Sequence, residues 1–304
     1  MPRTIQELFT YSATDMSAIA RDARASFTCP IQGGPCSKNN DDGAERGDPI
    51  LGGPLGVCSV FNPQAVGPSR ITCLCPTRLY GHGFETLRGL ARDVLGAPTQ
   101  PTYLFSEWVA NGMPDGVVLM GKGESGEFRT EAGSFDWIAG TTQAGKLVSY
   151  AGIEAQAIDT TGNYRANRAA LMRGEKVVPP SGHGLNWENV NKRIIPQLLR
   201  KGMLLKKLAE TEPAVGLGFL VDANVFAKFD ARLSNPMADD QGFDLVIHAY
   251  SLSATKEYEP PSLVKLKSIH ASVEQLAEKF LAVPGKPTSI ADQIARVFRS
   301  ASRR

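Results

Sequence analysis

Apolar residues recur at helical spacing near the start of the chain. Within residues 4–25, the apolar residues with this spacing are Ile5, Leu8, Phe9, Met16, Ile19 and Ala20. Residues three and four positions apart share one face of an α-helix, so this pattern predicts a helix over residues 4–25.

The middle of the chain predicts two helices and three strands. Residues 84–96 (FETLRGLARDVLG) have a helical pattern that ends at Gly96. Short apolar runs bounded by turn residues predict strands at 116–121, 134–139 and 147–158. A long helix is expected at 187–210, with Asn186 as its N-cap and a kink at Pro196, because proline has no backbone N–H.

The last third of the chain alternates between the two kinds of pattern. It predicts strands at 215–221, 243–249 and 263–268, and helices at 223–232, 271–282 and 288–300. Together with the preceding elements, this order predicts an α/β fold in which helices flank a central mixed β-sheet.

All five cysteines fall in the Gly-, Pro- and Asn-rich residues 26–80. Such a segment buries little apolar surface, and a long loop in a compact domain is unusual unless something fixes it. Cytosolic cysteines rarely form structural disulfides, whereas thiolates on tight turns suit a tetrahedral metal site. Zinc and iron both accept four thiolates, and the alternative is a set of buried, inert cysteines. We expect residues 1–83 to form an N-terminal helix and a metal-binding region, and residues 84–304 to form the catalytic domain.

Cys73 and Cys75 are separated by one residue and would point to opposite sides of an extended segment. The spacing alone therefore does not decide which four cysteines share an ion.

Composition adds little to these expectations. The 304 residues are 42% hydrophobic and carry a formal net charge of +2. No apolar run is long enough to span a bilayer and residues 1–20 lack a secretory pattern, so we expect a cytoplasmic protein with no membrane partner. One basic cluster could bind DNA or could be a solvated helix face; it consists of Lys192, Arg193, Arg200, Lys201, Lys206 and Lys207.

The strand at 147–158 carries the candidate chemistry. Glu154 and Gln156 share one face of an extended strand, while Ile153, Ala155 and Ala157 form an apolar face on the other side. Asp136 precedes Glu154 by a distance that suits a connection between neighbouring strands. Two converging carboxylates bind Mg²⁺, which activates water for attack on a phosphate. The alternative is a satisfied Glu–Gln pair in an ordinary sheet.

This Asp…Glu-x-Gln arrangement resembles the PD-(D/E)xK nuclease superfamily, with Gln156 in place of the usual lysine. Glutamine is uncharged, so it can orient a water or a phosphate oxygen but cannot supply positive charge.

Other motifs make the resemblance more specific. They are Thr28-Cys29-Pro30, Cys36-Ser37-Lys38, Gly56-Val57-Cys58, Cys75-Pro76-Thr77-Arg78, Ser134-Phe135-Asp136-Trp137, Gly152-Ile153-Glu154-Ala155-Gln156, Asp159, Gly162-Asn163-Tyr164 and Leu185-Asn186 through Lys192-Arg193. In order and approximate spacing, from about residue 27 to about 220, the chain resembles the NotI family of restriction endonucleases.

That resemblance implies Asp136, Glu154 and Gln156 as the active-site trio. It implies an iron site, in a structural role, at Cys29, Cys36, Cys58 and Cys75, and leaves Cys73 as an extra thiol. The family cuts palindromic, GC-rich DNA as a homodimer. We therefore expect a bacterial type II restriction endonuclease that uses Mg²⁺.

Several polar residues beside this strand are candidates for DNA contact. Asn186, Asn189, Lys192 and Arg193 lie on the first turns of the helix at 187–210, although Lys192 and Arg193 could instead form a surface salt-bridge face. Tyr164, Arg165 and Arg168 could reach DNA or belong to a helix surface. The four histidines have no spacing that suggests a second metal, and we expect them to be structural.

Two other functions remain open. One is a non-cutting DNA-binding protein descended from such a nuclease, which the intact pair of Asp136 and Glu154 disfavours. The other is a repair or structure-specific nuclease with the same core.

Overall fold

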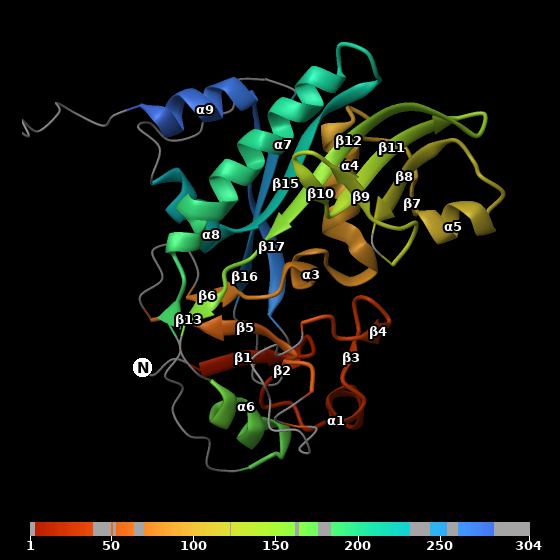
Figure 1. Cartoon of the computed structure of the whole chain (residues 1–304). Helices are drawn as coiled ribbons and strands as arrows, with labels where there is room; N and C mark the ends of the chain where they lie inside the picture. The colour runs from red at the N-terminus through yellow and green to blue at the C-terminus, as the bar shows by residue number, and fades with distance from the viewer. Residues whose placement is uncertain are drawn as a thin grey trace, which may run out of the picture.

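The computed structural model describes residues 4–38, 50, 53–63, 70–121, 123–161, 164–175, 184–231, 244–253 and 261–282 (Figure 1). The expected helix at 288–300 and the arginines at positions 296, 299, 303 and 304 lie outside these residues. In the part of the chain that is described, no helix is both long and apolar enough to cross a membrane.

A seven-stranded mixed sheet forms the centre of the molecule, in the order β17-β16-β15-β12-β11-β8-β7. Strand β12 pairs in parallel with β15 and antiparallel with β11. The strands are β7 (Thr102–Leu104), β8 (Gly116–Gly121), β11 (Trp137–Gln143), β12 (Lys146–Gln156), β15 (Ala214–Asp222), β16 (Leu245–Ser253) and β17 (Ser262–Ala271). The predicted α/β class with a mixed central sheet is confirmed.

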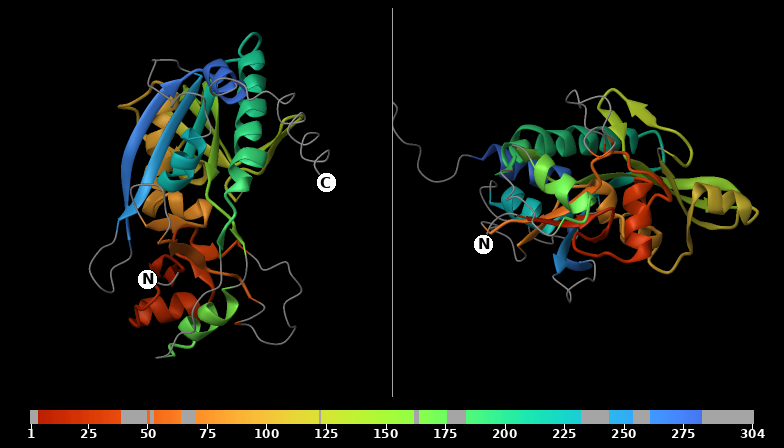
Figure 2. Two further views of the ribbon diagram at one scale, coloured as in Figure 1. Left: turned by 90° about the vertical axis from the view of Figure 1, so that its left-hand side faces the viewer. Right: turned by 90° about the horizontal axis from the view of Figure 1, so that it is seen from below.

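Helices cover both faces of this sheet (Figure 2). On one face α3 (Pro76–Leu79) and α4 (Glu85–Val94) pack against β12, β15 and β16. On the other face lie α7 (Ile195–Leu208), α8 (Ala223–Asp230) and α9 (Val273–Leu281). The short helix α5 (Phe105–Ala110) connects β7 to β8. The sheet therefore has a separate apolar core on each side.

The N-terminal region forms a second sheet, below the first in Figure 1, with strand order β2-β1-β5-β6. Its strands are β1 (Thr4–Leu8), β2 (Tyr11–Ser12), β5 (Val57–Phe61) and β6 (Ile71–Cys73). The helix α1 (Ala18–Ala25) and the short hairpin β3 (Thr28–Cys29) and β4 (Gly34–Pro35) lie beside it. The helix predicted at 4–25 is thus wrong in its first half, where the chain forms a β-hairpin.

The physical reason for this error is a buried carboxylate. Ile5 and Glu7 share the buried face of β1, and Glu7 is fully buried. Its Oε1 accepts a hydrogen bond from Arg78 Nε at 2.8 Å, and its Oε2 accepts one from Ser59 Oγ at 2.6 Å. A charged residue in an inward position hides the two-residue alternation that marks a strand.

Residues 26–80 also bury more apolar surface than expected. Val57, Val60, Ile71 and Leu74 are all nearly inaccessible to solvent. Strand β6 is tied to the central sheet, because the Cys73 backbone N–H donates to Asp222 Oδ2 at 3.0 Å. Later chain returns to this region as well: the guanidinium of Arg168 in α6 (Arg165–Met172) donates to the carbonyls of Ile50, Pro54 and Leu55. A domain boundary at residue 83, within η1 (His82–Phe84), stays a prediction.

The predicted helix at 187–210 divides into two parts. Residues Val190–Ile194 (η2) have π-helical hydrogen bonding, and α7 follows directly. Pro196 lies in the first turn of α7, and Glu188 and Asn189, before η2, are already helical, so the helical segment begins close to the predicted residue 187. Because proline lacks an N–H, the ordinary i→i+4 pattern cannot continue through it, and a wider turn precedes it.

Two short antiparallel strand pairs, the hairpin β9 (Phe128–Thr130) with β10 (Gly133–Phe135) and the pair β13 (Thr160–Thr161) with β14 (Gly184–Leu185), lie at the ends of β11 and β12. The predicted strand at 134–139 is therefore interrupted at Asp136, between β10 and β11. Both strand pairs border the residues that carry the candidate chemistry.

Candidate active site

Asp136 and Glu154 come from neighbouring strands and lie side by side. Residues Trp137 and Ile153 are direct partners in the β11–β12 ladder, which places the preceding and following residues opposite each other. The Asp136 backbone N–H donates to Glu154 Oε1 at 3.3 Å. The Ala155 backbone N–H donates to Asp136 Oδ2 at 2.9 Å. The juxtaposition of these two carboxylates predicted from the sequence is found in the structure.

The two faces of β12 also agree with the sequence pattern. Ile153 and Ala155 are buried in the core beneath α4, and Ala157 packs against the same core. Gly152 and Glu154 face α7 instead: a Cβ at Gly152 would lie 2.5 Å from the Phe135 ring and 3.0 Å from Leu205. Glycine at this position therefore allows α7 to approach the strand closely.

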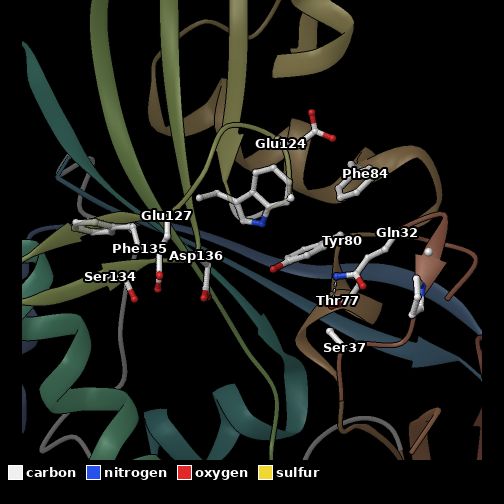
Figure 3. A pocket seen from close by; sticks show the side chains of 14 residues that line it. Gln32, Ser37, Thr77, Tyr80, Phe84, Glu124, Glu127, Ser134, Phe135 and Asp136 are labelled. Carbon is white, nitrogen blue, oxygen red and sulfur yellow. Dashed lines mark hydrogen bonds between the residues drawn. The ribbon is translucent and has the colours of Figure 1, made fainter. Parts of the chain in front are cut away.

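Asp136 opens onto a cleft of about 560 Å³ (Figure 3). Asp136 and Glu127 extend into it from the side of the sheet, while Tyr80 points toward them from the opposite wall. Thr77, Gln32 and Ser37 line the far side. The cleft thus has an acidic wall formed by the ends of the strands, and a wall of neutral polar residues from the N-terminal region.

Lys201 is a site residue that sequence reasoning placed elsewhere. It was grouped with the basic residues of a surface, but it is only 1% exposed. Its Nζ donates to Glu154 Oε1 at 2.5 Å and to the Ser134 carbonyl oxygen at 2.5 Å. The signal in the sequence was its spacing from Leu198 and Leu205, since all three lie on the buried stripe of α7.

Burial raises the pKa of both carboxyl groups. Burial, and then the nearby charge of Asp136, raise the pKa of Glu154 to about 7, although Lys201 opposes this shift. Burial also raises the pKa of Asp136, against the opposing effects of the Ala155 N–H and Lys201. Two carboxylates that repel each other in a poorly solvated place favour a cation between them.

The remaining carboxylate oxygens suit a hard divalent ion. Within the described residues, Asp136 Oδ1 and Glu154 Oε2 have no hydrogen-bond partner. Mg²⁺ commonly takes one or two carboxylates and completes its shell with water and phosphate oxygens. The donor set at Asp136 and Glu154 therefore fits Mg²⁺.

Gln156 lines a second cavity, of about 400 Å³. Its amide makes no side-chain hydrogen bond within the described residues, so it is available to a ligand. Lys38 and Arg193 contribute positive charge to this cavity, which shares Ser37 and Thr77 with the cleft at Asp136. An acidic site and a basic groove are therefore contiguous.

The other candidates for DNA contact have varied surroundings. Asn189 Nδ2 donates to Asp159 Oδ2 at 3.0 Å beside the second cavity, and the Asn186 N–H donates to the Asp159 carbonyl. Lys192 is exposed and lies 3.7 Å from Glu188, one helical turn away, as the salt-bridge alternative predicted.

Two of the candidates from α6 and its N-cap are internal. Tyr164 and Arg168 are buried, and Arg168 holds backbone carbonyls of residues 50–55. Arg165, the first residue of α6, is partly exposed. Contacts inside the protein, rather than with a ligand, account for the burial of Tyr164 and Arg168.

The four cysteines of the expected metal site gather in one place. Burial raises the thiol pKa of Cys29, Cys58 and Cys75, and neighbouring cysteines raise it further: Cys36 acts on Cys29, Cys75 acts on Cys58, and both Cys29 and Cys36 act on Cys75. Cys73 differs, because its thiol donates to the Cys75 carbonyl at 3.1 Å. These pairwise effects put the four thiols near one another. Within the described ranges, however, there is no group of three or more His, Cys, Asp or Glu side chains that could hold a metal ion.

Comparison of the chain with models of known protein families gives no match, nor does comparison with curated protein sequences. The contacts of Asp136, Glu154 and their neighbours are therefore the observations that bear on function.

Proposed function

We propose that the protein is a Mg²⁺-dependent endonuclease that hydrolyses phosphodiester bonds of double-stranded DNA. The observation that supports this most strongly is the pairing of Asp136 with Glu154 at adjacent strand ends. Each carboxylate has one oxygen held by the protein and one left over; Asp136 lines an open cleft, and Glu154 lies beside it at 1% exposure.

In this proposal Asp136 and Glu154 hold the magnesium ion. When bound, Mg²⁺ polarises the scissile phosphate and activates a water molecule. Gln156 orients that water or a phosphate oxygen through its amide, and it carries no charge of its own. No side chain forms a covalent bond with the substrate.

The basic groove beside the site accounts for binding of the DNA backbone. Arg193 is exposed, and Lys38, whose ammonium donates to the Leu74 carbonyl, lines the same cavity, so both can neutralise phosphates next to the scissile bond. Asn189 and Gln197 add hydrogen-bonding groups to the same wall. These contacts position the duplex but carry no sequence information.

Sequence specificity is the further part of the proposal and rests on the resemblance to the NotI family. It implies a homodimer that reads a palindromic, GC-rich site, because a two-fold symmetric protein matches a two-fold symmetric sequence.

We also propose a structural iron or zinc ion at Cys29, Cys36, Cys58 and Cys75. The residues that follow two of these cysteines, Ser37 with Lys38 and Pro76 with Thr77, line the clefts described above. An ion at the four thiols would fix the wall that faces Asp136.

Digestion of a fully sequenced phage genome with Mg²⁺, followed by sequencing of the fragment ends, tests the proposal. Discrete fragments that share one end sequence would support a restriction endonuclease. Cleavage without a shared end sequence would instead indicate a structure-specific or repair nuclease. Binding to DNA without cleavage would refute the proposed activity.

A further inference from the structure

The contact between Lys201 and Glu154 has no role in the function proposed so far. Lys201 is nearly inaccessible to solvent, and its ammonium lies 5.2 Å from the centre of the Phe135 ring. It donates at 2.5 Å both to Glu154 Oε1 and to the carbonyl oxygen of Ser134. A buried ammonium is costly unless it is paired and hydrogen-bonded, so these contacts explain how Lys201 is tolerated there.

The two contacts of Lys201 join the two parts of the candidate site. Glu154 is on β12, whereas Ser134 is on β10, two residues before Asp136. Lys201 therefore links the segment that carries one carboxylate to the strand that carries the other. The close approach of α7 over Gly152 brings it there.

Each carboxylate consequently has one oxygen held by the protein, and Glu154 Oε1 accepts from two donors. The Ala155 N–H holds Asp136 Oδ2, and Lys201 holds Glu154 Oε1, at a shorter distance than the Asp136 N–H does. Groups that fix the orientation of metal-binding carboxylates strongly affect metal affinity and activity.

We infer that Lys201 is the positioning residue of this site: from α7 it supplies the positive charge that Gln156 lacks and holds Glu154 so that one oxygen stays available to the cation. This inference rests on the proposed nuclease function. It distinguishes Lys201 from its helix neighbours Arg200 and Lys207, which are exposed.

The pair can first be tested without metal. In the presence of a chelator, the melting temperatures of Lys201→Met, Glu154→Gln and the double variant are compared with that of the unmodified chain. Each single change leaves a buried polar partner unsatisfied, so the double variant should lose several degrees less than the two single losses added together. Additive losses would show that the two side chains are not coupled, and would overturn the inference.

Cleavage provides the second test. Lys201→Met should reduce kcat at saturating Mg²⁺ by about 10–100-fold, while DNA affinity measured in Ca²⁺ changes less than about threefold. Lys146→Met, at the exposed far end of β12, is the matched control and should cleave normally. If Lys201→Met is too unstable to purify, Lys201→Gln keeps a hydrogen-bond donor without the charge and should show a smaller loss of kcat in the same direction.

The outcomes separate the two proposals. If the unmodified chain cuts DNA but Lys201→Gln and Lys201→Met cut at the same rate as Lys146→Met, the role of Lys201 is refuted and the nuclease function stands. If the unmodified chain does not cut DNA with any divalent ion, the nuclease function fails. A weakened DNA affinity with unchanged kcat would make Lys201 a DNA-binding residue and would also refute the inference.

Discussion

At the scale of single residues, the structure buries ionisable side chains beside specific partners. Glu154 keeps its position through Lys201, and Glu7 keeps its position through Arg78. His248 is a third example: it is 1% exposed, and its Nε2 lies 2.7 Å from Asp93 Oδ2. Partners satisfy these residues in the interior, except that His248 Nδ1 has no hydrogen-bond partner among the described residues, and their substitution has effects that their polarity alone would not predict.

His248 makes the stability of the fold dependent on pH. Burial lowers its pKa below the ordinary 6.5, although the hydrogen bond with Asp93 opposes this. The unfolded chain therefore binds a proton at this residue near pH 6.5 while the folded chain does not, so the free energy of unfolding falls as the pH drops below 6.5.

We predict that, between pH 7 and pH 5, the free energy of unfolding falls less for His248→Gln than for the unmodified chain. The glutamine retains a donor for Asp93. Urea unfolding at each pH measures this. His82→Gln, at an exposed position, serves as the control and should follow the unmodified chain. Equal acid sensitivity of the His248→Gln and unmodified chains would contradict the prediction.

At the scale of elements, the N-terminal sheet is joined to the helix α3, which packs against the central sheet, by a buried ion pair. Arg78 of α3 donates to Glu7 of β1 at 2.8 Å and to the carbonyl of Pro261, just before β17, at 2.5 Å. Three segments far apart in the sequence therefore meet at one guanidinium. Thr77 of α3, and Tyr80 directly after it, line the cleft at Asp136.

Arg78→Met should destabilise the fold by about 3–5 kcal/mol, because it leaves Glu7 charged and unpaired in the interior. Guanidinium chloride unfolding measures the loss. Arg21→Met, on the exposed side of α1, should change stability by less than about 0.5 kcal/mol. A loss of stability of similar size in both variants would show that the Arg78–Glu7 ion pair does not specifically stabilise the fold.

Arg193 should contact DNA from the groove beside Gln156. Arg193→Gln should weaken binding to all duplex sequences alike, and should reduce the slope of log affinity against log salt by about 1. Binding measured in Ca²⁺ over a range of salt concentrations gives this slope. An unchanged slope would remove Arg193 from the phosphate contacts.

The sequence predicted those elements whose patterns depend on local neighbours. The strands at 116–121 and 147–158 and the helix at 84–96 were found because their apolar residues follow the period of each element. Strand β1 was missed, because Glu7 satisfies its charge with a residue 71 positions away. Lys201 was assigned to the surface for the same reason, as its partner lies on another element. Asp136 and Glu154 were identified from spacing and resemblance, but no local pattern could show which cation accompanies them.

At the scale of the whole molecule, the cysteine-rich segments and the ends of the central strands line the same two cavities. Ser37 and Lys38, after Cys36, and Pro76 and Thr77 of α3, after Cys75, line these cavities together with Asp136 and Gln156. In the proposed function, a metal ion at the thiols would act on the shape of the DNA-binding surface without taking part in the chemistry.

The purified chain should contain about one iron or zinc ion per molecule, because four thiolates complete the tetrahedral shell of one such ion. Elemental analysis of Cys58→Ser should show that most of this metal is lost. Cys73→Ser is the matched control and should retain it, since that thiol bonds to a backbone carbonyl instead. Absence of both metals from the unmodified chain, or equal loss in the two variants, would refute the four-cysteine assignment.

The pairing of Asp136 with Glu154 is tested most directly by plasmid cleavage. Supercoiled plasmid carrying a cleavable site is incubated with Mg²⁺ and the unmodified chain, Asp136→Asn or Glu154→Gln, and DNA binding is measured separately in Ca²⁺. The unmodified chain should linearise the plasmid, while both variants should bind it with similar affinity and cut at least about a thousandfold more slowly, as expected for losing several kcal/mol of metal-derived stabilisation. Normal cleavage by either variant would contradict the account.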